Sequence, residues 1–302
     1  MRVDPFYTTN LVGSLDQAQA SVQQLTSELS SGVRVTSLSQ DPVASGENVL
    51  LLNQMQQDDS FTQSANLVTG QLQVADSALG SVVSQLTQAI SLATSANNGT
   101  MNSSSVKSIA NQISGILNEV TSLANSSYQG QYIFAGGQTA TAPFVTSTAT
   151  TPATTTYNGD ENVNYLHTPS GQKIQLNVPG DQIFMGTGSN SVFGALNSLI
   201  ADYSSGSVNT AQAVNDTQAL GSALNYVSQQ RVTIDNSMTQ VTAASDAVSN
   251  VQAQLTTAQT NLMQADIPTI STQLSQTEAQ QTALISVIAQ LNSYQNDLFS
   301  KL

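Results

Sequence analysis

The longest hydrophobic pattern in this chain lies between residues 213 and 262, where an apolar side chain recurs at every seventh position. This spacing places the apolar side chains along one side of an α-helix, while most residues between them are Gln, Asn, Ser and Thr. A single helix cannot bury such a stripe by itself, so we expect it to pack against other helices. Its expected core positions include Val227, Ile234, Val241, Val248, Leu255 and Leu262.

Two more segments carry the same repeat and are expected to supply the partners. Asp41 followed by Pro42 is typical of a helix start, with Asp as the capping residue and Pro in the first turn. That helix is expected to end before residues 97–99, which read Asn-Asn-Gly, and a third helix is expected over 104–125. The core positions predicted on these two helices are Leu72, Leu79, Leu86, Ile109 and Ile116.

Amphipathic patterns also mark both ends of the chain. The first predicts a helix that ends at Gly32, and the last follows Pro268 and continues to residue 302. Because these stripes have no evident partner within the chain, we expect them to bind other copies of it. The expected assembly positions are Leu11, Leu15, Val22, Leu25, Leu29, Arg34, Leu284, Ile288, Leu291, Leu298 and Leu302.

The pattern between residues 128 and 188 indicates β-structure. Residues 132–134 are Tyr-Ile-Phe, Asn158-Gly159 is a hairpin signal, and Ile174, Leu176 and Val178 alternate with polar residues. A short helix is expected over 191–203. The predicted fold is therefore mainly α with a small β insertion: a long antiparallel bundle or coiled coil formed by both termini, with a β-rich domain at its distal end.

This pattern divides the chain into three expected parts. Residues 1–40 together with 266–302 would form terminal assembly helices. Residues 41–127 together with 189–265 would form the long bundle, and residues 128–188 would form the β-rich outer domain.

The composition of the chain disfavours several classes of function. Only 8% of the 302 residues are charged, the net charge is −13, and six residues are basic, which disfavours binding to nucleic acid or to an anionic membrane. The chain has no cysteine, no apolar run of membrane-spanning length and no apolar segment typical of a signal peptide. A surface without cysteine, with few charges and with many Ser, Thr, Asn and Gln residues leads us to expect an extracellular protein. Such a protein would have to be exported without a cleaved signal peptide.

No group of residues predicts catalysis, and we expect no catalytic, cofactor-binding or metal-binding residues. His167 is the only histidine, and it has no other ligand type at a suitable spacing. The adjacent carboxylates Asp58-Asp59 fit a solvated helix face, and Asp160-Glu161 fits a turn, because neighbouring side chains do not point at one another. Arg34 follows a helix end and could pair with a carboxylate of a neighbouring chain or remain solvated.

Short motifs connect both ends of the chain with one family. Residues 29–35 (Leu-Ser-Ser-Gly-Val-Arg-Val), followed by residues 41–44 (Asp-Pro-Val-Ala), resemble the N-terminal signature of the bacterial flagellin family. Residues 264–267 (Gln-Ala-Asp-Ile) resemble the segment before that family's terminal helix, although Pro268 departs from its usual pattern. Asp41-Pro42, residues 131–139 and residues 157–160 resemble the hook-associated branch of the family rather than filament flagellin.

The resemblance implies an extracellular structural subunit that forms a junction layer between hook and filament, and not an enzyme. Its implied partners are other copies of itself, hook-associated protein 1, flagellin and an export chaperone, with no nucleic acid, membrane or cofactor. Two alternatives remain open from the sequence. One is a small filament-forming flagellin, and the other is a glycan-binding or enzymatic module carried by the β insertion on a helical stalk.

Overall fold

A computed structural model describes residues 5–147, 152–186, 188 and 191–300, and its chain divides into two compact units. Residues 1–56 and 250–302 form one unit, called here the terminal unit, and residues 57–249 form the other, called the bundle unit. Helices dominate both units, with a few short antiparallel strands, which confirms the predicted fold class. The helices are α1 Pro5–Ser31, α2 Pro42–Asn97, α3 Ser103–Ala124, α4 Val192–Ser204, α5 Thr210–Met263 and α6 Ile267–Ser300.

The helix boundaries follow the local signals in the sequence. The carboxylate of Asp41 accepts a hydrogen bond from the backbone N–H of Ala44 at 3.0 Å, so Asp41 caps α2, and Pro42 occupies the first position as predicted. Gly32 ends α1 with a φ of +69°, a left-handed conformation that favours glycine. These two residues explain why the chain leaves one helix and enters the next within ten residues.

Pro268 lies in the first turn of α6, where it causes no break in the helix. Asp266 precedes the helix, and its carboxylate accepts hydrogen bonds from the backbone N–H and the hydroxyl of Thr269 at 3.2 and 2.8 Å. Proline is tolerated there because N–H groups in a first turn have no partner within the helix. The departure from the family pattern at position 268 is therefore compatible with a regular terminal helix.

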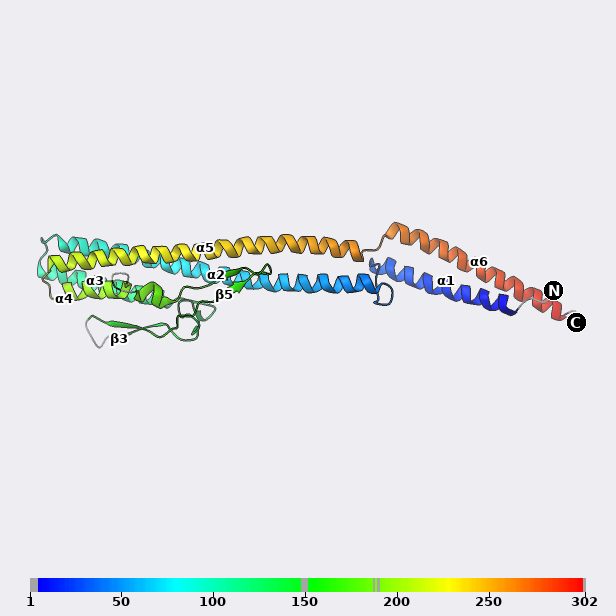
Figure 1. The fold of residues 1–302 in the computed structure, drawn as a ribbon, viewed down its shortest axis with the longest axis horizontal. Helices are drawn as coiled ribbons and strands as arrows, with labels where there is room; N and C mark the ends of the chain where they lie inside the picture. The colour runs from blue at the N-terminus through cyan, green and yellow to red at the C-terminus, as the bar shows by residue number, and fades with distance from the viewer. Residues whose placement is uncertain (1–4, 148–151, 187, 189–190, 301–302) are drawn as a thin grey trace. The chain divides into compact units, whose positions relative to one another are not determined.

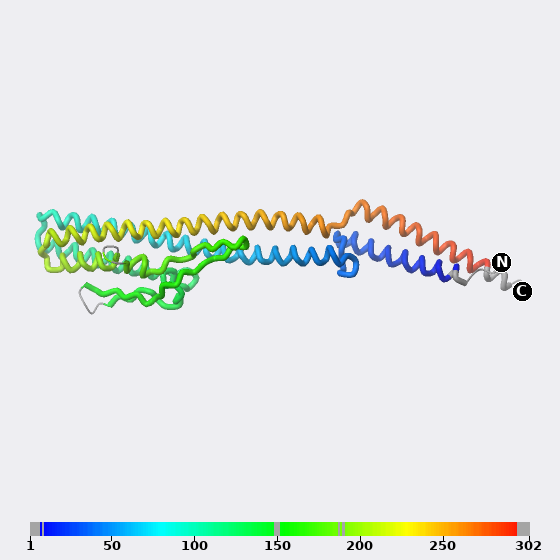
Figure 2. The backbone as a smooth tube through the Cα atoms, in the orientation of Figure 1, coloured from blue at the N-terminus to red at the C-terminus, as the bar shows by residue number. Residues whose placement is uncertain are grey.

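The hydrophobic core lies in the bundle unit, where α2, α3, α4 and α5 run side by side (Figures 1 and 2). All four helices contribute buried side chains to it, and Leu79, Leu86 and Val227 have no exposed surface. The predicted core residues that belong to this buried cluster are Leu72, Leu79, Leu86, Ile109, Ile116, Val227, Ile234, Val241 and Val248. Leu255 and Leu262 are only half-buried and lie outside it, because they belong to the terminal unit, which contains neither α3 nor α4.

The strands form three separate two-stranded antiparallel sheets. They pair β1 Ser127–Tyr128 with β2 Gln131–Tyr132, β3 Phe144–Ser147 with β4 Thr154–Tyr157, and β5 Tyr165–His167 with β6 Lys173–Gln175. A π-helical turn, η1 Asp181–Met185, follows. Phe134, Phe144, Phe184 and Phe193 contact one another with ring centroids 5.3 to 5.9 Å apart, and these contacts hold β3 and η1 against α4.

Asn158-Gly159 does not form the predicted hairpin turn. It lies between β4 and β5, and these two strands do not pair with each other, because β4 pairs with β3 and β5 pairs with β6. Gly159 is needed for another reason, because a Cβ atom there would lie 2.4 Å from the Tyr157 hydroxyl and 2.8 Å from the Ala135 carbonyl oxygen. The close approach of these groups, and not a turn, accounts for the glycine.

In the terminal unit, α1 packs alongside α6 (Figure 1). The loop between α1 and α2 also forms an antiparallel bridge to the segment between α5 and α6, in which Val33 pairs with Gln264. The N–H of Arg34 donates to the Met263 carbonyl at 2.7 Å, and the N–H of Ala265 donates to the Gly32 carbonyl at 3.0 Å. Segments more than 200 residues apart in the sequence are thereby joined by main-chain hydrogen bonds.

Candidate assembly surface

The terminal helices leave much of their apolar surface uncovered. The positions predicted for assembly on α1 and α6 are half-buried: Leu11, Leu15, Val22, Leu25, Leu29, Leu284, Ile288 and Leu291. Leu298 belongs to α6, where the structure describes its backbone, and Leu302 lies outside the described residues. The pairing of two helices covers one side of each stripe only, and neighbouring residues such as Val12 and Ile285 remain about half exposed.

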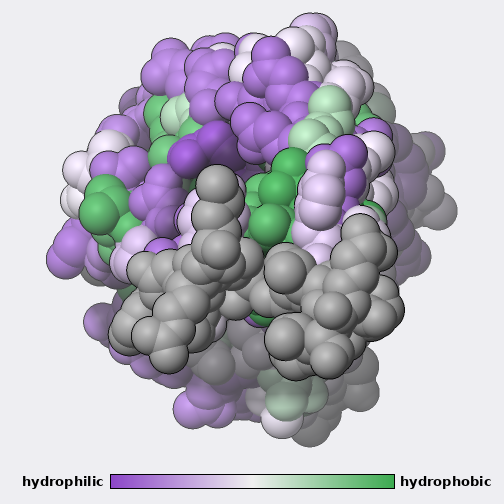
Figure 3. Space-filling view, turned by 90° about the vertical axis from the view of Figure 1, so that its right-hand side faces the viewer, coloured by the Kyte–Doolittle hydropathy of each residue, from purple (hydrophilic) through white to green (hydrophobic). Residues whose placement is uncertain are grey.

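The two units differ strongly in how many of their apolar residues are buried. Of the described residues, 42 hydrophobic ones are buried in the bundle unit, but only Ala18, Val35, Ala44, Ala265 and Ile270 are buried in the terminal unit. Of the 18 large hydrophobic residues found exposed, 12 belong to the terminal unit. Figure 3, which views the molecule from the side of α1 and α6, shows apolar residues gathered in several places among hydrophilic ones. The terminal unit therefore lacks a core of its own.

The most exposed apolar side chains surround the start of α2. Leu38, Val43 and Leu50 expose 68 to 72% of their surface, and Val49 and Leu52 are also exposed. The sequence analysis did not select these residues for assembly. The signal was present in residues 49–52 (Val-Leu-Leu-Leu), because four consecutive apolar residues extend around all sides of a helix and two helices cannot cover them all.

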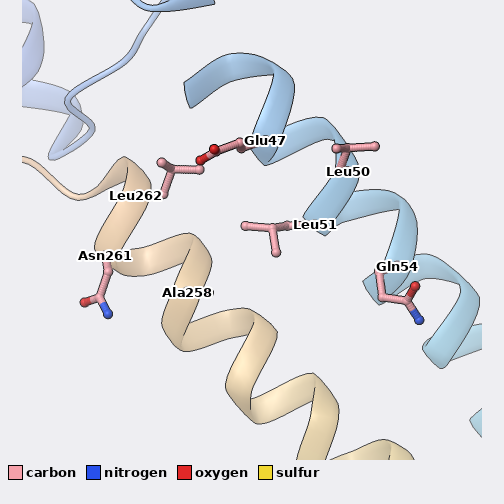
Figure 4. A pocket seen from close by; sticks show the side chains of 7 residues that line it. All are labelled: Glu47, Leu50, Leu51, Gln54, Ala258, Asn261 and Leu262. Atoms are coloured by element: carbon pink, nitrogen blue, oxygen red, sulfur yellow. The ribbon is translucent and has the colours of Figure 1, made fainter. Parts of the chain in front are cut away.

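A groove lies beside this segment, between α2 and α5 within the terminal unit (Figure 4). It has a volume of about 600 Å³, and the side chains of Leu51 and Leu262 point into it from the two helices. Across the same helix pair, the side-chain amide of Gln259 donates to Oδ1 of Asn48 at 3.0 Å. The residues that line the groove are Glu47, Leu50, Leu51, Gln54, Ala258, Asn261 and Leu262.

Arg34 forms its contacts within the chain. Its guanidinium donates to Oδ2 of Asp41 at 3.2 Å and to the Leu262 carbonyl at 3.2 Å. The N–H of Ala44 and then the Arg34 guanidinium lower the pKa of the Asp41 carboxyl from its ordinary value. Within one chain, Arg34 therefore links the loop, the cap of α2 and the end of α5, and its pairing with a neighbouring chain stays a prediction.

The residues weighed for chemistry occupy structural positions. His167 lies at the exposed end of β5, opposite Lys173 on β6. Asp160 accepts a hydrogen bond from the N–H of Gly137 at 2.5 Å, which lowers the pKa of its carboxyl and holds two loops together. Asp58 contradicts the predicted solvated face, because only 1% of its surface is exposed.

Two further searches apply to the described residues only. Among them, no group of three or more His, Cys, Asp or Glu side chains is arranged to hold a metal ion. In the same part of the chain, none of the helices combines the length and apolar character that a bilayer crossing requires.

Comparison with known families accounts for this architecture. Residues 7–139 match the bacterial flagellin N-terminal helical region, and residues 217–302 match the bacterial flagellin C-terminal helical region. The chain belongs to the bacterial flagellin family. The flagellin-family regions contain nearly all of α1, all of α2, α3 and α6, and most of α5. Proteins of this family are structural components of the flagellum and not enzymes.

Individual relatives within the flagellin family point to one branch. The chain is 31% identical over 187 residues to flagellar hook-associated protein 3 of Salmonella typhimurium, covering 62% of this chain and 57% of that protein. It is 32% identical over 139 residues to the protein of the same name from Escherichia coli, covering 46% of this chain and 44% of that protein. The chain thus matches about half the length of these relatives.

A solved structure supports the fold independently. The structure of a putative flagellar hook-associated protein from Vibrio parahaemolyticus is similar with a TM-score of 0.67 and 18% identity. The match covers 74% of this chain and all of that one. At this level of identity, the likeness concerns the arrangement of helices and strands.

Proposed function

We propose that this chain is a structural subunit of the bacterial flagellum that forms the junction layer between hook and filament. The observation that carries the proposal is the unfinished terminal unit, with five buried hydrophobic residues and 12 large exposed ones among those described. Exposed apolar surface of this extent is typical of protein–protein interfaces. Helical stripes from neighbouring copies would cover this surface. The similarity to hook-associated protein 3 supports a position of the layer between hook and filament.

The parts of the chain would have separate roles in this layer. Residues 1–40 and 266–302 would supply the helices that associate between copies, and residues 41–127 with 189–265 would form the supporting bundle. Residues 128–188 would form an outer β-rich domain. The assembly positions that we propose on α1 and α6 are the predicted stripe residues, and Leu38, Val43, Val49, Leu50 and Leu52 extend the surface onto α2.

The proposed partners follow from a position between hook and filament. Besides other copies of this chain, they would be hook-associated protein 1 on the hook side and flagellin on the filament side, with a chaperone that covers the terminal helices before export. The protein would act outside the cell and would leave it without a cleaved signal peptide. The low content of charged residues, 8%, is consistent with helices whose surfaces meet other helices more than solvent.

Deleting the coding region in the source bacterium tests the place in the flagellum. We expect electron micrographs to show hooks without attached filaments, while secretion of flagellin into the medium continues. Normal filaments on the deletion strain would contradict the proposal. The purified full-length chain should also fail to polymerise alone into long filaments, because growth of such filaments would identify a small filament-forming flagellin instead.

Complementation of the deletion strain tests the surface. Val43→Ser with Leu50→Ser removes two exposed apolar side chains from the terminal unit, and Leu67→Ser with Val232→Ser removes two from the bundle unit. We expect the first pair to be secreted but to restore filaments poorly, and the second pair to restore them fully. Equal restoration by both pairs would show that the terminal unit does not mediate assembly.

A further inference from the structure

The apolar core between α2 and α5 leaves the axial position of the two helices undetermined. On α2, the buried residues Leu72, Leu79 and Leu86 repeat every seven positions, and on α5 Val227, Ile234 and Val241 do the same. Sliding one helix by seven residues, about 10 Å, would again place apolar residues opposite apolar residues. Hydrophobic burial therefore favours several registers by similar amounts.

A charged contact in the bundle unit distinguishes these registers. Arg231 of α5 donates to both carboxylate oxygens of Asp76 on α2, through Nε to Oδ1 and through Nη2 to Oδ2, the latter at 3.0 Å. Such a two-pronged contact depends on the relative position of the two groups. The hydrogen bond to Asp76 and the charge of Asp76 raise the pKa of the Arg231 guanidinium.

The alternative registers offer no equivalent contact. Arg231 is the only Lys or Arg in α5. One heptad before and after Asp76, α2 carries Thr69 and Val83, and neither supplies a negative charge. A slip in either direction would therefore separate the guanidinium from its carboxylate partner on α2, whereas Asp235, which also favours the charged guanidinium, lies on α5 itself and would move with it.

Gly80 contacts the guanidinium at the same place. It lies one helical turn after Asp76, and a Cβ atom there would lie 3.6 Å from Cζ and Nη1 of Arg231, which shows that the guanidinium rests over this glycine. One heptad away, the corresponding positions carry the larger residues Gln73 and Thr87. A Cβ atom at 3.6 Å would make an ordinary van der Waals contact, so a small residue suffices here, but a slip would place one of these larger residues next to the guanidinium.

We propose that the Arg231–Asp76 ion pair, seated over Gly80, fixes the axial register of α5 against α2. A half-exposed ion pair adds little net stability, but a single polar contact in a repetitive apolar seam is well suited to specify one register. Asn97 and Thr217, whose side chains lie 3.3 Å apart, join the same helices at one end. This end contact is a single bond between neutral groups, and the ion pair supplies the charged contact that a slipped register would lose.

Spin-label distances in the full chain test the proposal. Gln63→Cys on α2 and Asn225→Cys on α5 place unique labels at exposed sites, since the chain has no other cysteine. We expect one distance population in this parent. After refolding, replacement of the pair by Arg231→Leu with Asp76→Leu should give a second population displaced by about 10 Å.

Two control variants define the outcomes. Exchange of the charges, Arg231→Asp with Asp76→Arg, should retain the single parental distance. Gln73→Leu with Gln229→Leu adds two leucines at exposed sites of the same helices and should also retain it. A single parental distance in the Arg231→Leu, Asp76→Leu variant would overturn the proposal. Loss of its helical circular dichroism would do so as well, because the apolar repeat alone should hold the helices together.

Discussion

The hydroxyl of Tyr203, in α4, donates a hydrogen bond to Oδ1 of Asn97, the last residue of α2, at 2.9 Å. Burial raises the pKa of this hydroxyl to about 12, and the side chain has no exposed surface. Tyr203→Phe should lower the free energy of unfolding by roughly 1–3 kcal/mol, because it leaves a buried acceptor without its donor. Chemical denaturation measures this loss. Tyr165→Phe, at a half-exposed site on β5, should change little.

Asp202 should make the bundle unit less stable as the pH rises. Burial, followed by the hydrogen bond and charge of Asp216, raises the pKa of the Asp202 carboxyl from 3.8 to about 6. The folded chain therefore keeps a proton that the unfolded chain releases, and the free energy of unfolding falls as the pH rises between these values. Asp202→Asn should remove this dependence and stabilise the protein at pH 7 by about 1–2 kcal/mol, a value reduced for solvent screening.

Denaturation midpoints between pH 3.5 and pH 7 measure this effect of Asp202, in steps of roughly half a unit, fine enough to follow one titrating group. Asp246→Asn, at an exposed position of α5, serves as the control and should leave the pH dependence of unfolding in place. A profile of Asp202→Asn that runs parallel to that of the parent would show that Asp202 does not titrate in this range.

Gly136 and Gly171 offer a matched pair of glycine substitutions. Both have a left-handed backbone, with φ of +68° and +86°, but only Gly136 lacks space, since a Cβ atom there would lie 2.2 Å from the Asp160 carbonyl oxygen. Gly171→Ala should cost about 1 kcal/mol for the backbone alone. Gly136→Ala should cost about 3 kcal/mol or more, because the loop around Asp160 must move and lose hydrogen bonds. Similar thermal midpoints for both variants would contradict this interpretation.

Ile234 and Val232, two residues apart in α5, allow the same substitution to be compared at a buried and at an exposed position. Ile234 is 2% exposed and faces the core, whereas Val232 is 56% exposed. Ile234→Asp should unfold the bundle unit, since a buried unpaired carboxylate costs more than about 4 kcal/mol. Val232→Asp should change the free energy of unfolding by about 0.5 kcal/mol or less. Circular dichroism and thermal melting distinguish the two, and a cooperative, parent-like melt of Ile234→Asp would contradict the assigned core.

Hydrogen exchange should separate the terminal helices from the bundle in a monomeric sample. In α1, only Ala18 and Glu28 are buried among the described side chains, whereas α3 buries eight residues. Amides of residues 11–29 should therefore exchange rapidly in the monomer and slowly in the assembled layer, while those of α3 stay protected in both. Equal protection of α1 and α3 in a sample shown to be monomeric would contradict this expectation.

The sequence predicts the helices well because each carries a repeat and a boundary signal. Asp41-Pro42 and Gly32 mark their helix ends by local chemistry that needs no distant contact. The core positions from Leu72 to Val248 follow from spacing alone, since a stripe at every seventh residue fixes which face of each helix is buried. The family resemblance from residues 29–35 and 41–44 is confirmed by the same regions in the comparisons.

The errors arise where distant contacts decide the outcome. Asn158-Gly159 has the composition of a turn, but its glycine serves the packing of Tyr157 against Ala135. No local pattern reveals that Arg34 contacts a carbonyl 228 residues away as well as Asp41, and its role in assembly stays a prediction. The burial of Asp58 likewise depends on tertiary packing. These positions required the structure because their partners are not neighbours in the sequence.

The main-chain bridge between Val33 and Gln264 also has a consequence for the order of folding. Residues 57–249 contain a complete core and can fold as soon as they are available, but the terminal unit needs segments from both ends of the chain. A chain that emerges into its folding environment from one end therefore completes the bundle unit first. The terminal unit, which carries most of the exposed large hydrophobic residues among those described, then forms last, after segments from both ends have arrived.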